Sequence, residues 1–312
     1  MLSRRRFLEG TAGLSLIAGA GIGTRAAAQQ SLPTRPIPST GESLPIIALG
    51  TYRTFNVGSR AAELEPLVRV TQRFFEEGGR IVDSSPQYGP SEAAFGEVLS
   101  QIVNVPDDLF AATKVAIEGR EAGLRQMRES PEKMGVASID LMQIHNLRDW
   151  RTHLPVLREM KARGEIRYLG ISASREELYD EFVAVMRNEP LDFVQINYSV
   201  AERRAEEVIL PLARERGMAV LINRPFVAGA LFPRVAGRPL PDWAAEFECE
   251  SWAQFFLKFV LAHPAVTAVI QATTDERHLL DNLGAARGEM PNAAARARMV
   301  ETIGLTGRPP WD

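Results

Sequence analysis

Four residues with chemically useful side chains each lie at or just beyond the end of a short apolar run. Asp83 ends GRIVD, Tyr88 follows in SSPQY, Lys114 lies in LFAATK and His145 ends IDLMQIH. A phenol beside an ammonium group is a proton donor, and we expect the charge of Lys114 to lower the pKa of Tyr88 by stabilising the phenolate. Reduction of a carbonyl group requires an acid of this kind.

Each of these residues also has an ordinary structural explanation. A loop tyrosine packs over a rim, a lysine at a strand end is solvated, a single histidine packs in a core, and an aspartate before Ser84-Ser85-Pro86 forms a turn. The combination is harder to explain in that way, because Lys114 and His145 end the two apolar runs that follow the one ending at Asp83. If these runs are strands of a parallel barrel, their carboxyl ends gather all four side chains at one mouth.

Eight apolar runs alternate with helix-like stretches along the chain. The runs are LPIIALG, RIVD, LFAATKV, IDLMQIH, IRYLGIS, LDFVQIN, MAVLINR and VTAVIQA, and the stretches between them cover 61–77, 91–103, 119–134, 152–163, 176–188 and 203–216. Strands buried on both faces are continuously apolar, and their alternation with helices predicts a parallel sheet. Eight units predict an α/β fold class, a single-domain (β/α)8 TIM barrel over residues 41–312. Ser91 is the expected N-cap of the helix behind Tyr88.

Composition excludes several classes of function. The chain has 312 residues, of which 45% are hydrophobic and 24% are charged, as expected for one large domain. A formal charge of −3 without a long basic run argues against a nucleic-acid partner. The single Cys249 cannot form an internal disulfide and is interpreted as a packed side chain. No metal site is expected, because His145, His153, His263 and His278 lack ligand spacing.

The first 28 residues have the features of an export signal. A basic start precedes an apolar stretch from Leu14 to Ile22 and a small-residue end at Ala26-Ala27-Ala28. Ser3-Arg4-Arg5-Arg6-Phe7-Leu8 resembles the twin-arginine signal of bacterial exported proteins. We therefore expect a signal peptide over 1–28, a Pro-rich linker over 29–40, the twin-arginine export machinery as a partner and a periplasmic location. No stable membrane anchor is expected, because a spanning helix needs about 20 apolar residues.

Nearly the whole remaining chain resembles the aldo-keto reductases. The matching motifs are Gly50-Thr51-Tyr52, Asp83 followed by SSPQYGPSEAAFG at 84–96, Lys114, DLMQIHN at 140–146, GEIRYLGIS at 164–172, VQINYS at 194–199 and HLLDNLGA at 278–285. The resemblance implies a (β/α)8 barrel that reduces an aldehyde or ketone with NADP(H) or NAD(H). It also implies that Tyr88 is the general acid, that Lys114 lowers its pKa, that Asp83 holds Lys114 and that His145 orients the substrate carbonyl.

The cofactor site implied by the resemblance departs from the usual pattern. Its residues would be Gly50, Thr51, Ser172, Gln195, Asn223, Arg224, Thr273, Thr274, His278 and Asn282. Ala173 follows Ser172 where asparagine is common, and Asn223 replaces an aromatic residue that often stacks on the nicotinamide ring. The basic residue that usually holds the extra phosphate of NADPH is absent at Ala272. We therefore expect a weaker preference for NADPH than usual, with NADH also accepted.

Three further features leave alternatives open. The segment Thr273-Thr274-Asp275-Glu276 after the eighth run is expected to bind a cofactor phosphate at the start of a short helix. Thr273 and Glu276 also have the spacing of a capping box, so the alternative is that this segment is simply a helix start. Tyr52, Asn146 and Trp150 are expected to border the mouth and contact a small carbonyl substrate. Since a fold does not fix a function, a second hypothesis is a nicotinamide-binding sensor or interaction protein with weak or no turnover.

Overall fold

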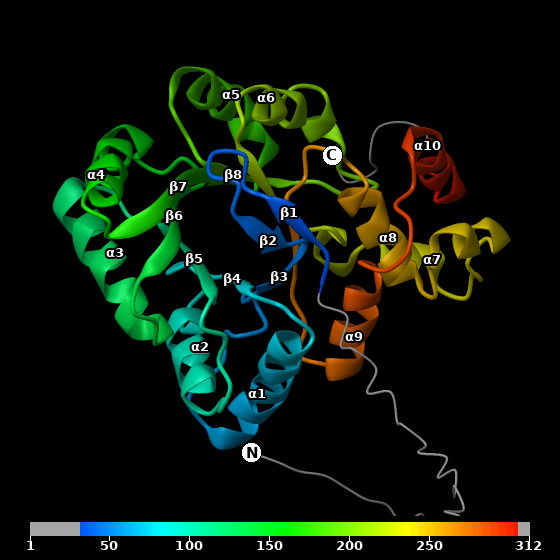
Figure 1. Cartoon of the computed structure of the whole chain (residues 1–312), viewed down its shortest axis with the longest axis horizontal. Coiled ribbons are helices and arrows are strands. Elements are labelled where there is room, and N and C mark those ends of the chain that lie inside the picture. Colours follow the sequence, from blue (N-terminus) through cyan, green and yellow to red (C-terminus); the bar gives the residue numbers. More distant parts are fainter. Residues whose placement is uncertain (1–31, 305–312) are drawn as a thin grey trace, which may run out of the picture. The chain divides into compact units, whose positions relative to one another are not determined.

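The computed structural model describes residues 32–304, and at their centre lies a closed barrel of eight parallel strands (Figure 1). The strands are β3 (Ile47–Gly50), β4 (Ile81–Asp83), β5 (Phe110–Val115), β6 (Ile139–His145), β7 (Ile166–Ala173), β8 (Phe193–Asn197), β9 (Ala219–Asn223) and β10 (Ala268–Gln271). Each strand pairs with the next in sequence, and β10 pairs with β3 to close the barrel. The predicted α/β fold class, a (β/α)8 TIM barrel, is confirmed. The predicted signal peptide lies outside the described residues.

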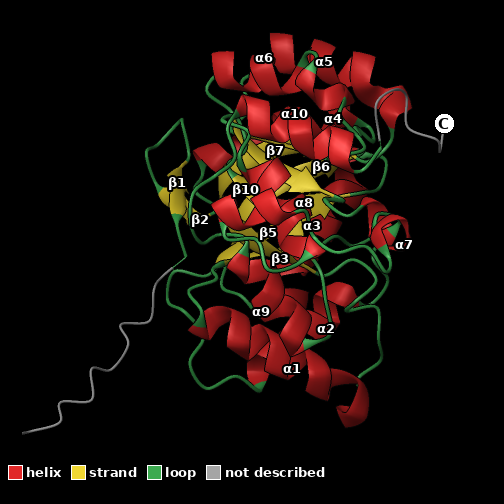
Figure 2. Cartoon of the chain, turned by 90° about the vertical axis from the view of Figure 1, so that its right-hand side faces the viewer, coloured by secondary structure: helices red, strands yellow, loops and turns green. Residues whose placement is uncertain are grey.

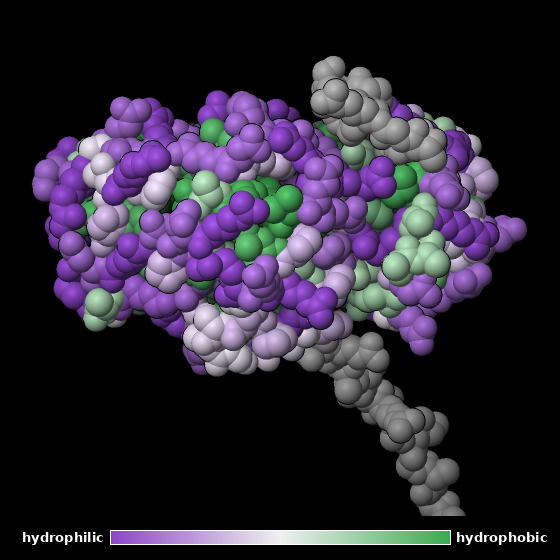
Figure 3. Space-filling view, turned by 90° about the horizontal axis from the view of Figure 1, so that it is seen from above, coloured by the Kyte–Doolittle hydropathy of each residue, from purple (hydrophilic) through white to green (hydrophobic). Residues whose placement is uncertain are grey.

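Helices pack around the barrel and over its carboxyl end (Figure 1). They are α1 (Ala61–Glu76), α2 (Ser91–Ser100), α3 (Arg120–Met134), α4 (Trp150–Ala162), α5 (Tyr179–Asn188), α6 (Ile209–Glu215), α7 (Phe232–Val235), α8 (Trp252–Leu261), α9 (Glu276–Gly284) and α10 (Ala293–Thr302). In most of these helices the apolar residues recur every three or four positions and one face packs inward, whereas α8 is buried on all sides. In α1 this face includes Leu67, Val70 and Phe74. Hydrophilic residues dominate the face seen in Figure 3, and hydrophobic residues show between them in separate patches. Within the described part of the chain, no helix is long and apolar enough to span a membrane.

Strand alternation decides which side chains enter the barrel. Successive residues of a strand point to opposite faces, so residues two apart share a face. In β5, Phe110 and Ala112 belong to the cluster that fills the barrel, whereas Val115 packs outward against the helices. Lys114 has the same parity as Phe110 and therefore points inward. The same rule turns Asp83 and His145 into the barrel lumen.

An N-terminal hairpin covers the amino end of the barrel, where we expected a linker. β1 (Thr34–Pro36) pairs antiparallel with β2 (Ser43–Pro45), and Figure 2 shows this hairpin at one end of the barrel and α7 at the other. Ile37 and Leu44 are buried in the cluster that fills the barrel. The expected linker over 29–40 is therefore wrong for residues 34–37, because β1 pairs with β2 and the side chain of Ile37 closes the barrel floor.

Close packing of α2 against α3 fixes the position of the loop that carries Tyr88. A Cβ atom at Gly96 would lie 2.2 Å from the carbonyl oxygen of Lys133, so only glycine allows this approach. The predicted N-cap at Ser91 is wrong. Pro90 occupies the N-cap position, and the Ser91 hydroxyl instead donates to the carbonyl oxygen of Tyr88 at 2.6 Å. The start of α2 thus holds the Tyr88 backbone.

Candidate active site

A cavity of about 650 Å³ opens at the carboxyl ends of the barrel strands. It is lined by all four predicted catalytic residues and, among the other predicted site residues, by Gly50, Thr51, Tyr52, Asn146, Ser172, Asn223 and Arg224. Phe232 of α7 also lines it, so the cavity lies at the barrel end opposite the hairpin (Figure 2). Its volume is in the range of sites that hold small organic molecules.

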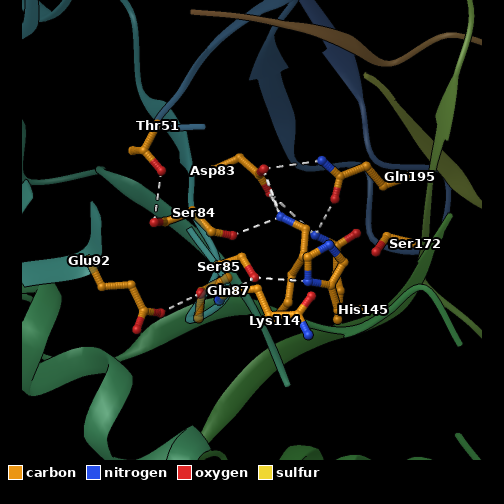
Figure 4. A network of polar contacts seen from close by, with 12 residues as sticks. Thr51, Asp83, Ser84, Ser85, Gln87, Glu92, Lys114, His145, Ser172 and Gln195 are labelled. Atoms are coloured by element: carbon orange, nitrogen blue, oxygen red, sulfur yellow. Dashed lines mark hydrogen bonds and ion pairs between the residues drawn. The ribbon is translucent and has the colours of Figure 1, made fainter. Parts of the chain in front are cut away.

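A buried ion pair forms the base of this cavity (Figure 4). Lys114 Nζ lies 2.9 Å from Asp83 Oδ1, 2.8 Å from Asp83 Oδ2 and 2.7 Å from the carbonyl oxygen of Ser84. The two side chains are 1% and 4% exposed. Burial is the largest single effect and acts to lower the pKa of Lys114, but the charges of and hydrogen bonds to Asp83 and Tyr88 together outweigh it, and the pKa is raised. Lys114 is therefore a fixed positive charge at neutral pH.

Two glutamine amides complete the surroundings of the Asp83 carboxylate. Gln143 Nε2 donates to Oδ1 at 3.4 Å, and Gln195 Nε2 donates to Oδ2 at 3.1 Å. The amides also join each other, with Gln143 Nε2 2.9 Å from Gln195 Oε1. We expected Gln195 to contact a cofactor, but its amide is bonded to Asp83 and Gln143 and does not line the cavity. The sequence analysis missed Gln143, although it shares strand parity with His145.

The Tyr88 ring lies over the ion pair and is held from several sides. Lys114 Nζ is 5.3 Å from the ring centroid, and the rings of Tyr52 and His145 are 4.9 and 5.7 Å away. Gly89 next to it has a φ of +63°, and a Cβ there would lie 2.4 Å from Asn56 Oδ1. Glycine thus permits the turn that directs the phenol toward Lys114.

The pKa of Tyr88 shifts in the direction opposite to the one we expected. Burial raises this pKa, and the charge of Asp83 adds to the rise, whereas the charge of Lys114 lowers it without cancelling the burial effect. The effect of Lys114 on this pKa can be expected from the sequence, but the effect of burying the Tyr88 ring cannot. The phenol is therefore protonated at neutral pH, as a proton donor must be.

His145 is an uncharged side chain at neutral pH. Burial lowers its pKa from 6.5 to about 3, and the nearby charge of Lys114 contributes. Its Nδ1 lies 2.9 Å from the hydroxyl oxygen of Ser85. The ring meets Tyr88 edge to face at an interplanar angle of 88°. A neutral imidazole beside a phenol can bind a carbonyl oxygen without competing for the proton of the phenol.

The loop after β10 differs from its sequence-based interpretation. Asp275 is the N-cap of α9, and its carboxylate accepts a hydrogen bond from the backbone N–H of Arg277 at 2.8 Å. The capping box predicted from Thr273 and Glu276 is therefore wrong. Thr273, Thr274, His278 and Asn282 do not line the cavity. Asn282 instead donates to Gln271 Oε1 at 3.0 Å.

Gln271 is a cavity residue that sequence reasoning missed. Its side chain is 1% exposed, and its Nε2 has no hydrogen-bond partner within residues 32–304. A buried donor without an acceptor is costly, so this nitrogen suits a ligand that brings an acceptor. No sequence motif marks it, since its role depends on the contact with Asn282.

The residues expected to contact substrate divide into two groups. Tyr52 is 51% exposed and lines the cavity. Asn146 lines it too, with its Oδ1 accepting hydrogen bonds from the backbone N–H and the hydroxyl of Ser174 at 2.8 and 3.1 Å. Trp150 is not among the lining residues, because its Nε1 donates to Glu181 on α5 at 2.8 Å.

In the described chain, no three His, Cys, Asp or Glu side chains are grouped to hold a metal ion.

Known proteins resemble this chain along most of its length. Aldo-keto reductase YhdN of Bacillus subtilis is 26% identical over 214 residues, which cover 62% of each protein. The NADH-specific methylglyoxal reductase of Escherichia coli is 26% identical over 199 residues, or 54% of this chain and 58% of that protein. The chain thus matches less than two thirds of the length of these relatives.

Solved structures share the fold. The aldo-keto reductase AKR11C1 from Bacillus halodurans has a TM-score of 0.69 at 20% identity, covering 90% of this chain and 99% of that one. The Bombyx mori aldo-keto reductase AKR2E4 in complex with NADP has a TM-score of 0.68 at 20% identity, covering 87% and 93%. The model of the Aldo/keto reductase family matches residues 46–294. This chain belongs to the aldo/keto reductase family.

Proposed function

We propose that the chain is an NAD(P)H-dependent reductase of an aldehyde or ketone. The observation that carries the proposal is the grouping of Tyr88, His145 and the Asp83–Lys114 ion pair on one cavity at the barrel mouth. A carbonyl oxygen placed between the Tyr88 hydroxyl and the His145 ring meets two neutral polar groups beside a fixed positive charge. This arrangement stabilises negative charge that develops on the oxygen.

The side chains have separate tasks in this reaction. When bound, the reduced nicotinamide supplies the hydride that the carbonyl carbon accepts. Tyr88 then gives its proton to the carbonyl oxygen, and the ammonium group of Lys114 stabilises the phenolate that remains. Asp83 keeps Lys114 charged and fixed, with the amides of Gln143 and Gln195 holding the carboxylate in turn. His145 orients the carbonyl group.

The cavity wall has groups that suit a nicotinamide dinucleotide. Gln271 Nε2 is a buried donor in need of an acceptor, and Asn223 and Arg224 line the same cavity from the end of β9. We propose that NADH is accepted as well as NADPH; the Escherichia coli relative is NADH-specific by its name. The support is local charge: Asp275 and Glu276 bring negative charge to the start of α9, and Ala272 at the cavity edge offers no cationic group for a second phosphate.

One titration tests the proposed reductase activity. Tyr88→Phe should bind NADH and NADPH normally, as followed by cofactor fluorescence, while aldehyde-dependent oxidation of the cofactor falls by about a hundredfold or more. Tyr179→Phe is a matched control, since Tyr179 is a buried tyrosine on α5 that does not line the cavity. Normal turnover by Tyr88→Phe contradicts the mechanism, and absence of cofactor binding by the wild type contradicts the function.

The sensor hypothesis is not favoured by these observations. A protein that only binds a nicotinamide has no need of a phenol placed over a buried lysine or of a neutral imidazole beside it. Maintaining such a pair has a cost, because two charges must leave water. The presence of Tyr88, the Asp83–Lys114 ion pair and His145 together therefore supports turnover.

We also propose that the chain is exported to the periplasm by the twin-arginine route. The support is the segment Ser3-Arg4-Arg5-Arg6-Phe7-Leu8 with the apolar stretch and Ala26-Ala27-Ala28 behind it. Replacing Arg4 and Arg5 by lysine should keep the protein in the cytoplasm in cell fractionation, whereas Arg25→Lys should not. Export of the double variant at the wild-type level contradicts this proposal.

A further inference from the structure

The hydroxyl of Ser85 faces a ring nitrogen of His145 (Figure 4). Ser85 comes two residues after the end of β4 and is 0% exposed. Its oxygen has two neighbours, the backbone N–H of Gln87 at 3.2 Å and His145 Nδ1 at 2.9 Å. The hydroxyl is closed off from bulk solvent, so its hydrogen bonds are made with these neighbours.

The hydrogens around this oxygen can be assigned one by one. An amide N–H can only donate, so the Ser85 oxygen accepts from Gln87. The hydroxyl carries one hydrogen, and a buried donor without an acceptor is costly. Among the described residues, His145 Nδ1 is the acceptor within hydrogen-bond distance. If Nδ1 carried its own hydrogen, two donors would face each other or the hydroxyl hydrogen would remain unpaired.

We propose that Ser85 is a positioning residue that fixes His145 as the tautomer with hydrogen on Nε2. The Ser85 hydroxyl donates to Nδ1, so Nδ1 is an acceptor and the ring hydrogen is on the opposite nitrogen. Nε2 makes no hydrogen bond to the described part of the chain, and His145 lines the cavity. The cavity thus faces an imidazole N–H donor.

This tautomer is the one that carbonyl reduction needs, so the role of Ser85 in catalysis rests on the proposed function. A carbonyl oxygen has only lone pairs to offer, and it requires a donor from His145 and a donor from Tyr88. The opposite tautomer would present a lone pair to the substrate oxygen and repel it. Because burial and the charge of Lys114 hold the pKa of His145 at about 3, the ring stays neutral and cannot supply both hydrogens at once.

Nitrogen NMR of the full chain without substrate tests the tautomer directly. With histidine as the only ¹⁵N-labelled residue, four side chains give signals. His145 is assigned by its disappearance in His145→Gln or, if that variant does not fold, by elimination with His153→Gln, His263→Gln and His278→Gln. We expect an imine-type signal for Nδ1 and a pyrrole-type signal for Nε2. The reverse pattern in the wild type overturns the proposal.

Two serine variants separate the hydrogen bond from general packing. In Ser85→Ala, Nδ1 loses its donor, so its imine signal should move toward that of a free imine nitrogen. Ser84→Ala is the matched control, because Ser84 is also fully buried but its hydroxyl pairs with Thr51 at 2.8 Å. It should leave the His145 signals in place. An unmoved Nδ1 signal in Ser85→Ala overturns the proposal.

Kinetics give the functional consequence of the same substitution. We expect Ser85→Ala to lower kcat/KM for an aldehyde about fivefold, the equivalent of one neutral hydrogen bond. An unchanged kcat/KM contradicts the catalytic part of the proposal. Absence of any aldehyde reduction by the wild type instead contradicts the proposed function, and leaves the tautomer assignment to the NMR result.

Discussion

Removal of Lys114 should destabilise the protein more than the loss of an ordinary buried side chain. Lys114 Nζ is 2.8 Å from Asp83 Oδ2, and at an effective dielectric constant of about 20 this pair attracts by about 6 kcal/mol. Desolvation of both charges offsets most of that gain. Lys114→Met removes the attraction but leaves the carboxylate buried, so we expect the free energy of unfolding to fall by about 3–5 kcal/mol.

A second substitution shows whether the unpaired Asp83 carboxylate causes this loss of stability. Asp83→Asn in the Lys114→Met background removes the charge and keeps one side-chain oxygen, which accepts from one of the two glutamine amides. We expect this double variant to recover about 2 kcal/mol of the loss. Urea unfolding followed by the fluorescence of the four tryptophans measures each value.

Lys258→Met provides a matched control for the loss of a buried lysine. Lys258 on α8 is 0% exposed, and its Nζ donates to the carbonyl oxygens of Arg287 and Glu289. Lys258→Met leaves no buried carboxylate without a partner, so we expect the free energy of unfolding to fall by about 1–2 kcal/mol. We expect kcat to be unchanged. Lys114→Met should lower kcat by about a hundredfold or more, because Tyr88 loses its stabilising charge. Equal stability losses in the two lysine variants, or no recovery in the double variant, would refute the orphaned-charge explanation.

Three further predictions concern other parts of the molecule. Acidification from pH 7 to 4 should lower the free energy of unfolding by about 3 kcal/mol through His145, because this histidine takes up a proton at an ordinary pKa of 6.5 in the unfolded chain and only at about 3 in the folded chain. In urea unfolding, His145→Gln should lack this part of the loss. Gly96→Ala should lower the free energy of unfolding by about 1–3 kcal/mol, since its Cβ would lie 2.2 Å from Lys133 O; an unchanged Tm would contradict the packing. Ala272→Arg, at the cavity edge, should shift the ratio of NADH to NADPH dissociation constants about tenfold toward NADPH; no shift would contradict the charge argument.

The barrel could be predicted from sequence because its signals are local. Each strand is a continuous apolar run, and period-two alternation turns Asp83, Lys114 and His145 to the same face as the apolar residues that fill the lumen. The hairpin at 34–45 could not be predicted in this way. Its prolines indicated a linker, whereas a two-stranded edge tolerates proline where no ladder hydrogen bond is needed.

The errors at the site come from burial and loop conformation. Neighbouring charges can be guessed from sequence, but the desolvation that raises the pKa of Tyr88 depends on the whole surroundings of the ring. The contact between Ser85 and His145 depends on the path of the loop after β4, which no periodic pattern encodes. Asp275 rather than Thr273 begins α9 for the same reason.

The hairpin that closes the barrel floor also sets an order for biosynthesis. The guanidinium group of Arg35 in β1 donates to the carbonyl oxygens of Leu261 and Val266, which follow it by 226 and 231 residues. The ribosome therefore makes the residues of the hairpin long before this anchor exists, and the apolar cluster that buries Ile37 and Leu44 is complete only when Ala268 of the last strand has emerged. Contacts of such separation form late in folding. The first residues of the barrel domain to be synthesised are thus among the last to find their partners.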